Sequence, residues 1–135
     1  MFPELVNIWS PEYNFKRKKA RPMVILTISV NACSSKRNEL LSACRSLSDK
    51  TRQENECIGF SISQDIDNEN SIHIEQTWER RSSLDAHFRS DIFSALLGAV
   101  KLLGESYVFR INDGSQIEGM QAVEAARLME GDLKE

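Results

Sequence analysis

The sequence contains few of the residues from which metal and redox sites are built. Its 135 residues include two histidines and three cysteines, and the cysteines lack C-x-x-C spacing. His73 and His87 lie on different predicted elements, with no cysteine or carboxylate at metal-ligand spacing beside them. We therefore expect no metal site, and we interpret the cysteines as reduced thiols of a cytoplasmic protein.

Long apolar runs and a net positive charge are also missing. No stretch approaches the ~18 apolar residues of a membrane helix, and the formal net charge of −3 provides no broad basic field for nucleic acid. We expect neither a membrane nor a nucleic acid as partner. The basic run from Lys16 to Arg21 ends residues 1–22, which hold all three prolines and show no sustained periodicity. We interpret residues 1–22 as a flexible, solvated N-terminal extension.

Residues 23–112 show the periodicities of alternating strands and helices. Apolar side chains at every second position predict strands over 23–30, 57–66, 71–78 and 106–112. Helical spacing predicts one helix ending near residue 53 and two more after residue 78. The resulting order, β-α-β-β-α-β, is that of a ferredoxin-like α+β domain, an antiparallel sheet with helices on one face.

Several local features of this pattern are specific enough to test. Ile58 and Phe60 should share the helix-covered face of the second strand. Ser82, with Asp85 three residues on, has the pattern of a capping box that begins a short helix. Ser90 is predicted to begin the next helix.

The remaining segments bear on assembly. The second face of the predicted sheet is semi-polar, with Met23, Ile25 and Thr27 on its first strand. Such a face needs a cover, and a second sheet from another copy would provide one, so we expect a homodimer. Residues 113–135 are interpreted as a C-terminal helical tail, because the stretch between Gly119 and Gly131 is rich in Ala, Met and Leu and predicts a helix.

The stretch QTWERRSSLDAHFRSDIF carries the most specific signal. Its tryptophan ends a strand on the face that the helices cover. The spacing resembles that of the antibiotic biosynthesis monooxygenase (ABM) superfamily of dimeric α+β barrels, which includes quinol monooxygenases and haem-degrading enzymes. The resemblance covers about residues 23–112 and rests chiefly on Trp78, Leu84, Ala86, His87, Ser90 and Phe93.

The resemblance implies a homodimeric monooxygenase that oxidises a small aromatic phenol or quinol with O2 alone, without cofactor, metal or flavin. Such chemistry needs a dry pocket with aromatic walls. Trp78 and His87 are then the candidate catalytic residues, the indole as a pocket wall and the imidazole as an acid–base group or a gate. Gln76, Phe93 and Tyr107 are candidate substrate-binding residues. Each also has a structural interpretation, Trp78 as plain core and His87 as a surface histidine of its helix.

The sequence departs from the superfamily pattern in two respects, of which one leaves a second function open and the other disfavours haem degradation. Ile74 stands where well-known cofactor-free members have an Asn, four residues before the matching Trp. The alternative is therefore a non-catalytic dimeric module that binds or senses a small molecule. Leu97 stands where haem-degrading members have their iron-ligating His, and Ile28 lies near the position of their strand Asn, so haem degradation is disfavoured.

Overall fold

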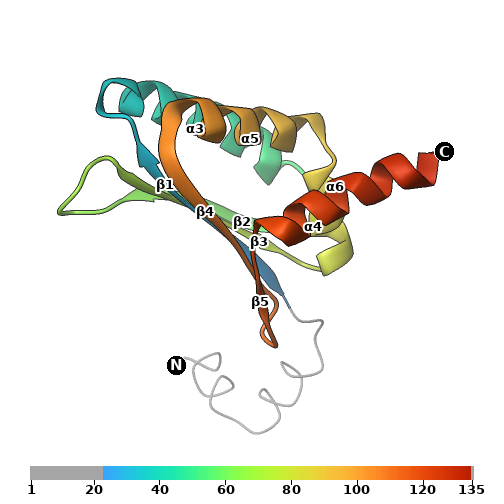
Figure 1. Ribbon diagram of the computed structural model, residues 1–135. Helices are drawn as coiled ribbons and strands as arrows, with labels where there is room; N and C mark the ends of the chain where they lie inside the picture. Colours follow the sequence, from blue (N-terminus) through green and yellow to red (C-terminus); the bar gives the residue numbers. More distant parts are fainter. Residues whose placement is uncertain (1–22, 135) are drawn as a thin grey trace, which may run out of the picture.

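A computed structural model describes residues 23–134, so the predicted extension over 1–22 lies outside the described residues. An antiparallel sheet with the strand order β2-β3-β1-β4-β5 carries the helices on one face (Figure 1). This confirms the predicted ferredoxin-like α+β fold. The elements are β1 (Val24–Ala32), the 3-10 turn η1 (Ser34–Lys36), α3 (Arg37–Arg52), β2 (Cys57–Gln64), β3 (Ser71–Trp78), α4 (Arg81–Phe88), α5 (Asp91–Leu103), β4 (Gly104–Asn112), β5 (Ile117–Glu118) and α6 (Met120–Lys134).

The hydrophobic core lies between the sheet and the helices α3 and α5. β1 is the central strand, and its alternating apolar residues point toward the helices and are buried. Ile28 in its middle pairs with Ile74 of β3 on one side and with Phe109 of β4 on the other. The period of two in the sequence therefore becomes a continuous apolar layer across three strands.

The second face of the sheet carries no helix among residues 23–134 (Figure 1). Met23 is 45% exposed and Val108 is 47% exposed. Between them, Thr27 pairs with Glu75 of β3 and with Arg110 of β4, so polar side chains share this face. The face is semi-polar, as predicted.

A β-bulge in β2 makes the prediction for Ile58 wrong. Cys57 pairs with Trp78, and Gly59 pairs with Thr77, the very next residue of β3. Ile58 is the extra residue between them and is 53% exposed rather than on the helix-covered face. The bulge reverses the alternation at this point, so Cys57 packs partly buried against the core.

The predicted capping box at Ser82 is also wrong. α4 begins at Arg81, which places Ser82 inside the first turn, and the N-cap makes no side-chain hydrogen bond. Asp85 instead accepts a hydrogen bond from Nε of Arg81 at 3.0 Å. The helix start predicted at Ser90 is confirmed, because its Oγ accepts the backbone N–H of Phe93 at 3.1 Å and caps α5.

Gly104 ends α5 and allows β4 to approach the core closely. A Cβ at this position would lie 2.7 Å from Cγ1 of Val30 and 2.8 Å from the carbonyl oxygen of Val100. Any residue with a Cβ would therefore require neighbouring atoms to shift. The glycine therefore sets the distance between the C-terminus of α5 and the sheet.

The predicted C-terminal helix is present as α6 and packs beside α4 (Figure 1). Val123 and Ala126 bury its inner side. Arg127 donates a hydrogen bond to the carbonyl oxygen of Phe88 at 2.6 Å, and Arg89 donates one to the carbonyl oxygen of Ala126 at 3.3 Å. No helix in the described part of the chain is long and apolar enough to cross a membrane.

Candidate functional site

The indole of Trp78 is buried at the end of β3 and is 1% exposed. His87 of α4 lies against it, with ring centroids 4.7 Å apart and planes inclined by 36°. Phe93 of α5 meets the imidazole edge to face at 5.5 Å. A strand end and two successive helices therefore bring Trp78, His87 and Phe93 into one cluster, because the chain turns back over the strand directly after the tryptophan.

Gln76 joins this cluster from the same face of β3. The indole N–H of Trp78 donates a hydrogen bond to its Oε1 at 2.9 Å. Its Nε2 is buried and has no hydrogen-bond partner among the described residues. The free donor beside the indole is therefore the amide N–H of Gln76, whereas the indole N–H is already engaged.

His87 is buried, with 1% exposure, which corrects its interpretation as a surface histidine of α4. Its Nδ1 lies 3.0 Å from Oε2 of Glu54, and its Nε2 has no partner within the described part of the chain. Burial lowers the pKa of the imidazole to about 4 and raises the pKa of the Glu54 carboxyl. Desolvation therefore keeps the imidazole neutral at neutral pH, so only one of its two nitrogen atoms carries a proton.

Tyr107 lies farther from this cluster than the other predicted residues. Its ring is 5.9 Å from that of Phe109, which in turn is 6.3 Å from Phe93. The structure thus places Gln76, Trp78, His87 and Phe93 together. Tyr107 reaches them only through an intervening phenylalanine.

Glu54 is the residue that sequence reasoning missed. It follows α3 in the polar stretch that leads to β2, where a carboxylate has no sequence pattern to distinguish it from a solvated loop residue. The contact joins positions 33 apart in the chain. Only the packing of this loop against α4 reveals it.

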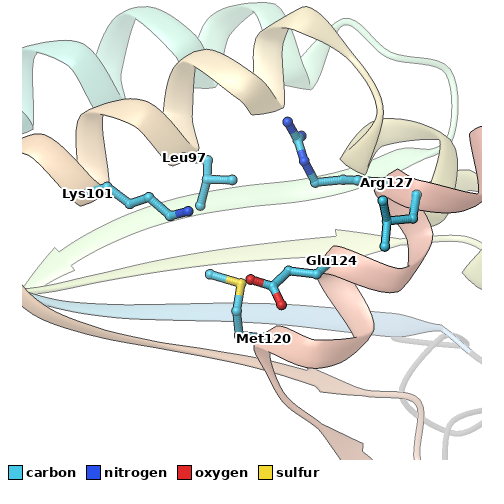
Figure 2. A pocket seen from close by; sticks show the side chains of 6 residues that line it. Leu97, Lys101, Met120, Glu124 and Arg127 are labelled. Carbon is cyan, nitrogen blue, oxygen red and sulfur yellow. The ribbon is translucent and has the colours of Figure 1, made fainter. Parts of the chain in front are cut away.

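A groove of about 400 Å³ lies between α5 and α6 (Figure 2). Figure 2 shows Leu97 and Lys101 of α5 facing Met120 and Glu124 of α6. The guanidinium of Arg127, also on its wall, lies over the ring of Phe93 at 5.9 Å. Arg127 thus links the groove to the aromatic cluster, although Phe93 itself is buried and does not line the groove. Its lining residues are Leu97, Lys101, Met120, Glu124, Arg127 and Leu128.

The fold and this cluster define a ferredoxin-like domain with a buried aromatic–histidine site, and the family follows from sequence comparison. The profile of the family described as antibiotic biosynthesis monooxygenase matches residues 23–98, more than half of the chain. The chain belongs to this family, which confirms the resemblance inferred from its residues. Membership supports a monooxygenase in general.

Individual proteins are similar to this chain in sequence or in fold. The uncharacterised protein sll1783 of Synechocystis is 24% identical over 93 residues, which are 69% of this chain and 63% of that relative. A conserved protein of Methanosarcina mazei has a TM-score of 0.65 at 22% identity, with 70% of this chain and 95% of that chain covered. The crystal structure of an antibiotic biosynthesis monooxygenase has a TM-score of 0.62 at 19% identity, with 69% of this chain and 99% of that chain covered.

Proposed function

We propose that this protein is a cofactor-independent monooxygenase that oxidises a small aromatic phenol or quinol with O2. One observation carries the proposal: Gln76 and His87, which both touch the Trp78 indole, each have one buried nitrogen atom, Nε2, that lacks a hydrogen-bond partner among the described residues. Buried polar atoms are nearly always paired, and an unpaired one costs roughly 1–3 kcal/mol. A substrate oxygen would satisfy both.

The chemistry uses a donor, an acceptor and aromatic walls. The Gln76 amide donates to an oxygen of the substrate, and His87 acts as the acid–base group. Trp78 and Phe93 keep water away from the electron-rich ring while it reacts with O2. One oxygen atom of O2 enters the product and the other leaves as water, with the substrate supplying all the electrons. No flavin or metal is needed for this balance.

We propose that the substrate reaches the cluster from the groove between α5 and α6. The groove has the size of small-ligand sites, which usually measure roughly 300–1,000 Å³. The route leads past Arg127, a lining residue whose guanidinium lies 5.9 Å from the ring of Phe93, and the Phe93 ring in turn contacts the His87 imidazole. Phe93 then separates the groove from His87, and Tyr107, which lies beyond Phe109, is left outside the proposed site.

Oxygen uptake tests this function. The wild-type protein, under air with a panel of phenols, quinols and anthrones, should consume O2 without added flavin and in the presence of a chelator. Trp78→Phe should lower the turnover rate at least tenfold, because the smaller ring no longer fills the wall against His87. Its cost in stability should be about 1–3 kcal/mol, since an aromatic ring remains.

Phe109→Leu serves as the matched control, because it removes a buried aromatic ring that lies against Phe93 and Tyr107 rather than against the indole. It should lower stability by a similar amount and turnover by less than threefold. If the wild type binds a phenol with quenched tryptophan fluorescence but consumes no oxygen, the protein is a binding module. The buried Ile74, which faces Ile28, would then explain the missing chemistry.

We also propose that two copies associate through the second face of the sheet. This face exposes Met23 and Val108 and carries no helix among the described residues. Exposed apolar side chains rimmed by polar ones are typical of protein interfaces. A second sheet packed against it would complete an α+β barrel.

A further inference from the structure

The loop between α3 and β2 holds Glu54 in a fixed place under α4. The backbone N–H of Glu54 donates to the carbonyl oxygen of Thr51 at 3.0 Å, and its own carbonyl oxygen accepts the N–H of Cys57 at 3.1 Å. Two residues on, the carbonyl oxygen of Glu56 accepts the N–H of Glu79, directly after Trp78, at 2.9 Å. The loop is therefore tied to the strand end that carries the indole.

This anchoring directs the Glu54 carboxylate at a single atom of the site. Both of its oxygens lie near Nδ1 of His87, at 3.0 and 3.3 Å. The other faces of the imidazole meet the rings of Trp78 and Phe93, so Glu54 is the charged group in the described structure that contacts it. An acceptor at Nδ1 determines which nitrogen of a neutral imidazole carries the proton.

We propose that Glu54 is a positioning residue: it holds the proton of His87 on Nδ1 and thereby leaves Nε2 as the acceptor for the hydroxyl proton of an uncharged phenol or quinol. This inference rests on the proposed oxygenase function and names its substrate class. A substrate that arrives as an anion is disfavoured, because the buried imidazole is neutral and the nearest charge is negative. Uncharged hydroxyl compounds are therefore preferred over aromatic carboxylates.

The proton transfer balances within the site. The O–H bond of the substrate breaks, an N–H bond forms at Nε2 of His87, and the electron pair stays on the oxygen as a phenolate. The imidazolium then lies between the phenolate and the carboxylate of Glu54, and both negative charges offset the cost of a buried cation. The phenolate is the electron-rich species that O2 oxidises in the proposed reaction.

Nitrogen NMR tests the positioning role without reference to activity. In a His73→Gln background, which leaves His87 as the sole histidine, two-bond ¹⁵N–¹H correlation spectra at pH 7 should show the tautomer protonated at Nδ1. Glu54→Gln keeps an oxygen acceptor and should retain this tautomer, whereas Glu54→Ala should give a mixture or the Nε2–H form. An unchanged, purely Nδ1-protonated imidazole in Glu54→Ala would overturn the inference.

Kinetics with an uncharged quinol provide the second measurement. Glu54→Ala should lower kcat at least tenfold, with KM within threefold of wild type. The kcat of Glu54→Gln should lie between those of wild type and Glu54→Ala, because the glutamine orients the imidazole without stabilising the imidazolium. Glu56→Gln is the control on the same loop, since the carboxylate of Glu56 pairs with Arg80 instead. The kcat of Glu56→Gln should remain within twofold of that of the wild type.

The two proposals fail in different ways. If the wild type turns over quinols and Glu54→Ala retains both its rate and its tautomer, the positioning role is wrong and the oxygenase function stands. If the wild type consumes no oxygen with any phenol or quinol, the oxygenase function is wrong, and the NMR result alone decides whether Glu54 orients His87. Faster turnover of an aromatic carboxylate than of its uncharged analogue would overturn the substrate class.

Discussion

Acidification should destabilise this fold through one buried side chain, His87. Its pKa falls from an ordinary value of 6.5 to about 4 in the folded protein, because burial disfavours the imidazolium. In the unfolded chain the same imidazole takes up a proton near pH 6.5. Between these two values the unfolded state binds more protons, so the free energy of unfolding decreases as the pH falls.

The size of the effect follows from the two pKa values. The difference between pKa values of 6.5 and about 4 corresponds to a total loss of about 3 kcal/mol in the free energy of unfolding. The full loss is reached only below about pH 4. Between pH 7 and pH 5.5 the loss should be about 1 kcal/mol. The raised pKa of Glu54 acts in the opposite sense, since its folded carboxyl binds a proton more readily, and this opposing contribution develops toward the lower end of the range.

Urea unfolding at pH 7, 6.5, 6 and 5.5 measures the effect as a shift of the midpoint at constant slope. His87→Gln removes the titrating group and should abolish most of the pH dependence. His73→Gln is the matched control, because it removes the other imidazole, which lies beside Ser29; a pH dependence that persists in this variant belongs to His87. If wild type and His87→Gln lose the same stability on acidification, His87 is not the buried neutral base that the structure indicates.

Three further predictions concern the scaffold. Gly104→Ala should destabilise the protein by about 1–3 kcal/mol in urea unfolding, because the new methyl group meets backbone and core atoms; Gly98→Ala, in open space on α5, should instead stabilise it by up to about 1 kcal/mol. Removal of residues 1–22 should leave the melting temperature within about 5 °C, which calorimetry measures, since they carry no core pattern; a larger loss would mean that they dock on the domain. Sedimentation at micromolar concentration should give twice the chain mass and Val108→Lys should give a monomer, whereas a monomeric wild type would contradict the dimer.

Much of this fold could be predicted because its signals are local. The alternation along β1 and the helical spacing along α5 each arise within one segment, where every second or every third to fourth side chain must face the core. Ser90 could be identified as a cap for the same reason, since the hydroxyl and the N–H that it accepts are three residues apart. Trp78, at the end of a strand on its covered face, could be placed in the core by counting alone.

The site's chemistry depended on contacts that only the tertiary structure makes. The bulge that exposes Ile58 is a property of the pairing between β2 and β3, and the alternation of one strand does not contain it. His87 lies on a short helix whose sequence does not distinguish a solvent-facing from a buried imidazole until α5 and the loop carrying Glu54 close over it. Residue order determined the family, the fold and the position of the indole; the protonation of His87 was decided by packing, because desolvation and a single carboxylate from a distant loop set which nitrogen carries the proton.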